Sequence, residues 1–211
     1  MSDPNVTVVS APRARMRVKT VTSLGMLTAV AYVTMLLSKM LPQVYGFLQL
    51  DVQATAITIG GFLFGPLAAA AISLVLPVIE MLTVSDTGPI GCLMNMLATA
   101  SFCCSAAFVY KKMHTRKGAV IGLTLGVIAQ VAVMLLWNYL ITPIYQGVPR
   151  DVVAGMLPTV FLPFNLVKGG LNMALTLLLY KPVVTALRKA RLVPERESTQ
   201  SSDRFDAGFL L

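Results

Sequence analysis

The sequence predicts an all-α membrane protein with six transmembrane helices, and three observations support that class. Of the 211 residues, 56% are hydrophobic and only 12% are charged, whereas about 25% are charged in a typical soluble domain. The mean hydropathy is +0.75. The Lys and Arg residues gather between and outside the apolar stretches, as in membrane proteins. The net charge of +8 therefore does not indicate binding to nucleic acid.

Six apolar stretches form the predicted bundle, and the turns between them are rich in polar residues, Gly or Pro. The second stretch is short and is interrupted by Gly61 and by Gly65-Pro66, which favours a broken or tilted helix. The first stretch carries Gly25 and Ala29 four residues apart, a spacing that lets another helix approach closely. The predicted spans cover about 20–41, 54–64, 67–84, 90–110, 119–141 and 159–181.

An even number of spans places both chain ends on the same side of the membrane. The basic clusters at 13–19, 111–117 and 188–191 all fall on that side, which identifies it as cytoplasmic. We therefore expect a cytoplasmic N-terminal tail at 1–19, a six-helix transmembrane substrate-binding domain at 20–190 and a cytoplasmic C-terminal tail at 191–211. We expect both tails to be disordered.

Two longer connections lie on the opposite, outer side of the predicted bundle. The first, LPQVYGFLQLDVQ at 41–53, is amphipathic and is expected to close over a ligand as a lid. The second, at 142–158, contains three prolines and is expected to be an irregular loop.

The last span carries polar residues that an apolar helix would not need. Asn165, Lys168 and Asn172 are spaced by three and then four residues, so they share one helical face. A lysine at the centre of a membrane helix costs about 2.5–3.5 kcal/mol. Such a residue is typically found facing a partner, a cavity or a ligand. The alternative is a lysine that reaches the nearer interface, with the amides joining neighbouring helices.

The predicted topology brings polar side chains from several spans to one depth in the outer half of the membrane. Polar side chains near the outer ends of the spans join polar side chains of the first outer connection. This is the layout expected of a cavity that captures a polar solute from outside. The candidate binding residues are Tyr45, Asp51, Glu80, Asn95, Asn138, Asn165 and Lys168.

The motifs of several enzyme classes are missing from the sequence. It contains no G-x-x-x-x-G-K-[ST] phosphate loop and no H-E-x-x-H metal motif. Its single histidine, His114, lies in a basic loop, and its three cysteines lack metal-ligand spacing. The class of function that remains is ligand binding, with two or three amides and one ammonium group as the binding groups. These suit a heteroaromatic ring whose edge alternates carbonyl and N–H groups.

Several segments resemble the substrate-binding S components of energy-coupling factor (ECF) vitamin transporters, specifically their riboflavin branch. The segments are GFLFGPLAA, WNYLITPIY and above all LPFNLVKGG, with its P-F-N-x-x-K pattern. The resemblance implies that Asn138, Asn165 and Lys168 bind the polar edge of riboflavin, which is the transported ligand, so no cofactor is expected. It also implies that a small-residue pair on the first helix, here Gly25 and Ala29, docks a transmembrane coupling subunit that works with two cytoplasmic ATPase subunits. The implied location is the prokaryotic plasma membrane.

Three other interpretations stay open at this point. The first is an S component for another heterocyclic vitamin such as thiamine or biotin, although Lys168 disfavours a cationic ligand. The second is a membrane enzyme acting on a lipid or quinone, with Glu80 and Lys168 as acid and base. The third is a structural six-helix protein whose amides are all satisfied.

Overall fold

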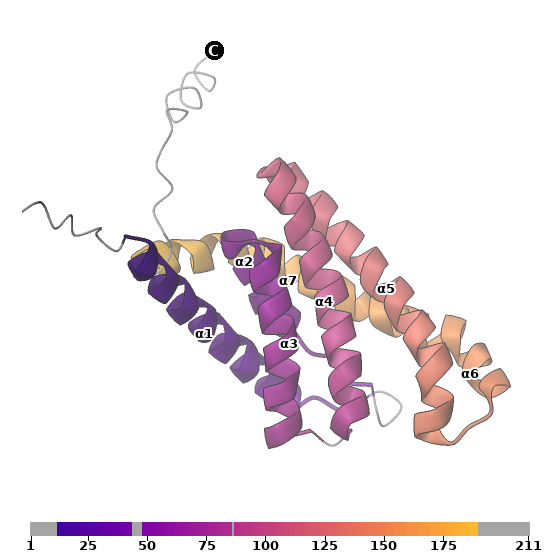
Figure 1. Ribbon diagram of the computed structural model, residues 1–211. Helices are drawn as coiled ribbons and strands as arrows, with labels where there is room; N and C mark the ends of the chain where they lie inside the picture. The colour runs from indigo at the N-terminus through magenta and orange to yellow at the C-terminus, as the bar shows by residue number, and fades with distance from the viewer. Residues whose placement is uncertain (1–11, 44–47, 86, 190–211) are drawn as a thin grey trace, which may run out of the picture.

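The computed structural model describes residues 12–43, 48–85 and 87–189. Every element of regular secondary structure in these ranges is helical, and the helices lie side by side as a bundle (Figure 1). The all-α class is thereby confirmed. The elements are α1 (Pro12–Ser38), α2 (Gln53–Phe64), α3 (Pro66–Thr83), α4 (Gly88–Met113), α5 (Arg116–Gln146), α6 (Arg150–Met156), the π-helical turn η1 (Leu157–Phe161) and α7 (Leu162–Lys189).

Five helical segments in the described ranges are long and apolar enough to cross a membrane. They are Thr20–Ser38 within α1, then α3, α4 and α5, and finally the continuous segment from Arg150 to Leu187. The remaining predicted span corresponds to α2. At 12 residues, α2 is about 18 Å long, so it does not cross a hydrocarbon core of about 30 Å by itself.

Helix α2 is the centre of the bundle although it is the shortest of the predicted spans. Ten of its twelve residues are buried, and it packs against α1, α3, α4 and α7. The chain reverses after it at Gly65, whose φ of 95° suits glycine, and Pro66 then starts α3 at a position where its missing N–H is harmless. The N-terminal end of α2, where Gln53 and Ala54 are buried, therefore lies inside the bundle.

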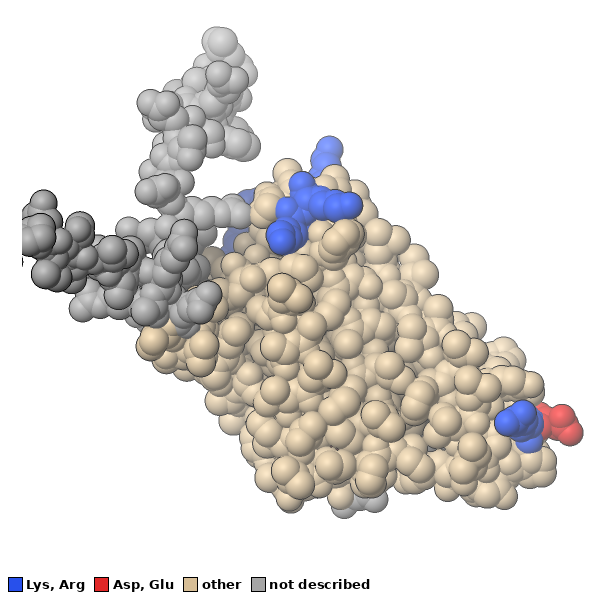
Figure 2. Space-filling view, in the orientation of Figure 1, with Lys and Arg blue, Asp and Glu red and all other residues tan. Residues whose placement is uncertain are grey.

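The surface of the bundle is apolar over most of its height and charged at its two ends. Large side chains such as Val33, Leu74 and Leu136 are at least half exposed, as expected for residues that contact lipid. Figure 2 shows Lys and Arg side chains gathered at one end, and a basic and an acidic group at the opposite corner near α6. Between these ends the visible face of the described residues is free of charge.

Two expectations about helix ends were wrong. Helix α1 begins at Pro12, eight residues before the predicted span, so part of the expected N-terminal tail is helical. The predicted irregular loop at 142–158 is mostly helix, with only 147–149 between α5 and α6. The rest of the predicted tails, 1–11 and 191–211, lies outside the described residues.

The prolines that suggested an irregular loop are each accommodated within or beside a helix. Pro143 lies three residues before the last helical position of α5, and membrane helices tolerate proline. Pro149 precedes the first helical residue of α6, where its fixed φ fits. Pro158 lies in the wider η1 turn, which closes through a hydrogen bond from the Leu162 N–H to the Leu157 carbonyl.

Helices α4 and α5 approach each other through glycines on α5. A Cβ atom added at Gly122 would lie 2.8 Å from the Ala106 carbonyl oxygen, and one added at Gly126 would lie 2.7 Å from the Phe102 carbonyl oxygen. Because both obstacles are backbone atoms, a larger residue must push the two helices apart.

We expect Gly126→Val to lower the free energy of unfolding by about 1–3 kcal/mol through overpacking, measured as a lower melting temperature in detergent. Gly170→Val is the matched control, because a Cβ atom at the exposed Gly170 meets nothing within 4 Å. Equal melting temperatures for the two variants would show that the close α4–α5 contact does not support stability.

Candidate functional site

A polar cavity opens at the end of the bundle opposite the basic cluster. It is lined by residues from α1, the α1–α2 connection, α3, α4, α5 and α7, and it encloses about 90 Å³. Its apolar lining includes Met35, Met94, Met134 and Phe164, whereas its polar lining includes residues from the α1–α2 connection, α3, α4 and α7. Of the predicted binding residues, Asp51, Glu80, Asn95, Asn165 and Lys168 line this cavity.

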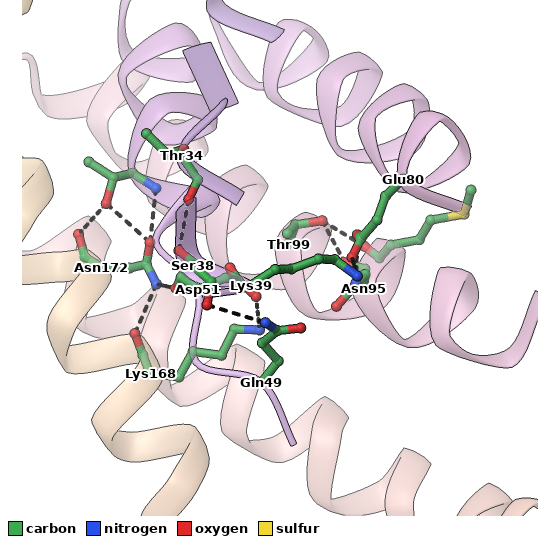
Figure 3. A network of polar contacts seen from close by, with 12 residues as sticks. Thr34, Ser38, Lys39, Gln49, Asp51, Glu80, Asn95, Thr99, Lys168 and Asn172 are labelled. Carbon is green, nitrogen blue, oxygen red and sulfur yellow. Dashed lines mark hydrogen bonds and ion pairs between the residues drawn. The ribbon is translucent and has the colours of Figure 1, made fainter. Parts of the chain in front are cut away.

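The most deeply buried charges in the cavity wall are Lys168 and Asp51. Their side chains are 9% and 6% exposed, and Lys168 Nζ donates to Asp51 Oδ2 at 2.5 Å. Asp51 lies just before α2, and Lys168 lies on α7, so the pair joins the two elements (Figure 3). The carboxylate supplies the counter-charge that a buried ammonium group requires. The other carboxylate oxygen, Asp51 Oδ1, is buried without a partner among the described residues.

One turn beyond Lys168, Asn172 serves as a structural link between α7 and α2. Its Nδ2 donates to the Asp51 and Lys168 carbonyl oxygens at 2.9 and 3.0 Å, and its Oδ1 accepts from the Thr55 N–H at 3.0 Å. The Thr55 N–H belongs to the first turn of α2, where no side chain from α2 itself acts as a cap. Asn172 therefore caps α2 from a neighbouring helix and positions Asp51 beside Lys168.

Asn165 lies one turn before Lys168 and also lines the cavity. It is 2% exposed, and its Nδ2 donates to the Phe161 carbonyl oxygen at 2.8 Å. Phe161 ends the η1 turn that Pro158 occupies, so this wide turn directly precedes the segment that carries the binding candidates. π-helical turns occur frequently at functional sites because they change the direction in which side chains point.

A second group of polar side chains lies where α1, α3 and α4 meet the cavity. Asn95 Nδ2 donates to Glu80 Oε2 at 2.9 Å, and Lys39 Nζ lies 3.6 Å from Glu80 Oε1. Lys39 also donates to the Val84 carbonyl oxygen at 2.7 Å. Figure 3 shows Lys39 extending between this group and the Lys168–Asp51 pair. The Lys39–Glu80 pair was not expected from the sequence. The feature of the sequence that points to Lys39 is its charge at the end of an otherwise apolar span.

Of the other predicted residues, Asn138, Gly25 and Ala29 are described and do not line the cavity. Asn138 is fully buried, and its amide is occupied within α5, since Nδ2 donates to the Met134 carbonyl oxygen and Oδ1 accepts from Thr142. Tyr45 lies outside the described residues. Gly25 and Ala29 are exposed on α1, away from the cavity. Within the described ranges no group of three His, Cys, Asp or Glu side chains is placed to hold a metal ion.

The fold and the cavity define a polytopic helical membrane protein with a polar site for a small solute enclosed between its helices. Residues 19–183 match the family model described as "ECF transporter, substrate-specific component", and the chain belongs to this family. It is accordingly a multi-pass protein of the cell membrane.

Curated proteins and solved structures are similar to this chain. The riboflavin transporter FmnP of Bacillus subtilis (strain 168) is 31% identical over 73% of this chain and 86% of its own length. The riboflavin transporter RibU of Staphylococcus aureus (strain TCH60) is 28% identical over 81% of this chain and 93% of its own length. A structure titled "Structure and mechanism of the S component of a bacterial ECF transporter" matches with a TM-score of 0.69 and 28% identity, covering 81% of this chain and 98% of that chain.

We expect Asp51→Ala to lower the free energy of unfolding by about 3–5 kcal/mol, because it leaves the Lys168 ammonium group buried without a counter-charge. The measurement is thermal unfolding in detergent. Adding Lys168→Met to Asp51→Ala should recover most of the loss, since the unpaired charge is then removed.

The control is Asp151→Ala, at an exposed carboxylate in the first turn of α6. Its effect should stay below about 1 kcal/mol. If the double variant is no more stable than Asp51→Ala, the two side chains are not coupled as an ion pair.

Proposed function

We propose that this chain is the riboflavin-binding subunit of an ECF-type, ATP-driven vitamin importer. The observation that carries the proposal is the placement of Asn165 and Lys168, which lie in one polar cavity beside the aromatic ring of Phe164. The curated proteins FmnP and RibU, to which this chain is similar, are both named riboflavin transporters, which supports riboflavin as the ligand.

The cavity chemistry suits the imide edge of a flavin ring. That edge presents carbonyl acceptors on either side of an N–H donor. Lys168 donates one of its three N–H groups to Asp51, which leaves two donors for carbonyl oxygens. Asn165 Nδ2 donates to the Phe161 carbonyl oxygen, and its Oδ1 can accept from the ring N–H. The apolar side chains of Met134 and Phe164 would contact the faces of the ring.

Asn138 is proposed as a third contact to the ring, on the basis of its place in the family pattern. Met134, one turn away on α5, lines the cavity, so this part of α5 lies beside the site. The Asn138 amide would have to exchange its hydrogen bonds to Met134 and Thr142 for bonds to the ligand. Asp51, Glu80 and Asn95 complete the proposed binding set, with Tyr45 from the first connection.

The orientation follows from the distribution of charge. Lys111, Lys112, Arg116 and Lys117 are exposed at the end of the bundle that carries the α4–α5 turn, and basic residues favour the cytoplasmic side. The cavity opens at the other end and would face outward. Both chain termini, including the segments 1–19 and 191–211, are then cytoplasmic.

The proposed transport cycle requires partner subunits, because the sequence contains no phosphate-binding loop of its own. We propose that the chain docks a transmembrane coupling subunit associated with two cytoplasmic ATPases. Gly25 and Ala29 lie on the exposed face of α1, where small residues let a partner helix approach closely. The chain itself would perform no chemistry on the ligand.

The interpretation as a membrane enzyme loses its main support in the structure. It required Glu80 and Lys168 to act together as acid and base. Glu80 contacts Lys39 and Asn95, whereas Lys168 contacts Asp51. The similar curated proteins are also transporters by name.

The proposal is tested by titrating the purified chain with riboflavin while following visible absorbance and the fluorescence of Trp137. A yellow flavin that co-purifies, or saturable quenching at one flavin per chain, is the expected result. A folded protein that is colourless and does not respond to riboflavin would rule the ligand out.

We expect Asn165→Ala and Lys168→Met each to weaken riboflavin binding by about 1–3 kcal/mol, because each removes a hydrogen-bonding group from the ring edge. Dissociation constants come from the same titration. The control is Gln130→Ala, at an amide that is buried on α5 but does not line the cavity. Unchanged affinity in both site variants would show that the ring binds elsewhere.

Docking is tested separately from binding by Ala29→Trp. We expect this variant to bind riboflavin normally but to lose most vitamin uptake in cells that contain the partner subunits, because the bulky ring blocks a close helix contact. Leu136→Trp, on the lipid-exposed face of α5, is the matched control and should transport normally. Equal uptake by the two variants would place the docking face elsewhere.

A further inference from the structure

A second hollow lies at the basic end of the bundle, apart from the polar cavity. It has a volume of about 230 Å³ and lies between the α2–α3 turn and the end of α4. We call it the inner notch, and its walls include Phe62, Phe64, Leu67, Lys111 and His114. The polar cavity and the inner notch share no lining residue, so the proposed function leaves the notch without a role.

The inner notch exists because α4 is longer than α3. The two helices are consecutive in the chain and run in opposite directions from the end of the bundle that holds the polar cavity. Helix α4 has 26 residues and α3 has 18, so at roughly 1.5 Å per residue α4 extends about 12 Å further toward the basic end. Figure 1 shows α4 and α5 projecting beyond the α2–α3 turn at that end. The end of α4 overhangs the turn and forms one side of the notch.

The depth of the notch in a membrane follows from the same helix lengths. Helix α3 is about 27 Å long and nearly spans a hydrocarbon core of about 30 Å. The α2–α3 turn then lies at the edge of that core, and the overhanging end of α4 lies among the lipid headgroups. The notch is accordingly at the level of the phosphate groups of one leaflet, which is the cytoplasmic leaflet in the orientation proposed above.

The notch carries donors and positive charge without a carboxylate. Lys111 and His114 line it, and both are exposed. The carboxylates of the described residues are all at the other end of the bundle: Asp51 and Glu80 line the polar cavity, and Asp151 lies in the first turn of α6 (Figure 2). Lysine is a common binder of phosphate, and an imidazole donates an N–H whether it is neutral or charged. The lining therefore favours an anionic ligand.

The two donors are placed at the notch by the last turn of α4. Lys111 and Lys112 are neighbours in this turn, but Lys112 Nζ lies 4.6 Å from the centre of the Phe108 ring, and only Lys111 lines the notch. His114 ends the helix at φ 42° and ψ 26°, a left-handed conformation in which glycine is usual. Its N–H donates to the Tyr110 carbonyl oxygen at 2.8 Å, which fixes the backbone that carries the imidazole.

The walls of the notch are held together by aromatic rings from three helices. Phe62 on α2 stacks on Tyr110 on α4, with ring centres 4.2 Å apart. The Tyr110 hydroxyl is 2.8 Å from the hydroxyl of Tyr180 on α7, and the two form a hydrogen bond. These contacts set the separation of the α2 and α4 walls, so a ligand meets a preformed site and loses less free energy to ordering it.

We propose that the inner notch binds the headgroup of an anionic phospholipid, with Lys111 and His114 donating hydrogen bonds to its phosphate group. Leu67 is 85% exposed at the rim, and its side chain lies against the acyl chains. This apolar contact favours a lipid over free phosphate. Basic pockets on the cytoplasmic side of membrane helices are suited to such headgroups. The lipid site is separate from the site of the proposed function and does not depend on the identity of the transported ligand.

The test measures how strongly the full-length chain retains phosphatidylglycerol in detergent, by native mass spectrometry, with phosphatidylcholine as the comparison. Phosphatidylglycerol is an anion, whereas phosphatidylcholine carries a compensating quaternary ammonium group. The notch variants are Lys111→Ala and His114→Asn, because asparagine tolerates the left-handed conformation. The matched control is Lys117→Ala, which removes a positive charge at the same end of the bundle but outside the notch. The melting temperature of each variant without added lipid shows whether it is folded.

We expect the unaltered chain to retain one phosphatidylglycerol at saturation, about fivefold or more tightly than phosphatidylcholine. Lys111→Ala should weaken this retention about fivefold, the change expected for one cation at a membrane surface. His114→Asn should weaken it about threefold or more, and Lys117→Ala by less than about twofold. Phosphatidylglycerol should also raise the melting temperature of the unaltered chain, whereas the same concentration of inorganic phosphate should not.

Three results would overturn the lipid site. They are equal retention of the two lipids, unchanged retention of phosphatidylglycerol in both notch variants, and an equal loss in Lys117→Ala, which would assign the effect to the charge of the whole end. If inorganic phosphate alone reproduces the rise in melting temperature, the notch binds a free anion and the lipid assignment fails. Riboflavin titration of the same variants should match the unaltered chain, so the lipid site and the proposed function stand or fall separately.

Discussion

The structure depends on neutralising one lysine within a membrane-embedded bundle. An ammonium group at the depth of Lys168 is costly unless a carboxylate or a polar cavity lies beside it. Asp51 supplies the carboxylate at 2.5 Å, but it can do so only if the start of α2 lies within the bundle against α7. Asn172 holds that arrangement, because its amide bonds to the backbone at Asp51 and at Thr55 together.

The short length of α2 follows from this constraint and creates the cavity. A helix that begins at Gln53, next to the buried Asp51, spans about 18 Å, which is too short to cross the bilayer. The space before its first residue is lined by the connection from α1 and by residues of α3 and α4, and their polar side chains meet there. One ion pair therefore fixes the depth at which the site forms.

The sequence predicted the parts of the site that depend on local spacing. Asn165 and Lys168 share a helical face through their three-residue separation, and topology placed Glu80 and Asn95 at the same depth; the structure brings all four to one cavity. Partners distant in the chain were beyond reach, because spacing shows which face a residue occupies but not what it meets. Asn172 shares that face, yet its bonds to Thr55 span 117 residues and make it a helix cap. The prolines at 143, 149 and 158 were misleading because proline disfavours the interior of soluble helices, whereas membrane helices tolerate Pro143, and a helix start and a π turn accommodate Pro149 and Pro158.

A transport protein has to keep its binding site intact before capture and after release. If the ligand were the only partner of Lys168, its departure would leave a buried ammonium group without compensation, at a cost of several kcal/mol. Here each cavity cation has a carboxylate within 4 Å, Asp51 for Lys168 and Glu80 for Lys39. The ligand then adds hydrogen bonds to groups whose charges are already balanced. Because the two pairs are each neutral, the site favours a neutral polar solute over an ion of either sign. Binding strength is consequently set by hydrogen-bond geometry and apolar contact, which can be gained and lost without disrupting the bundle.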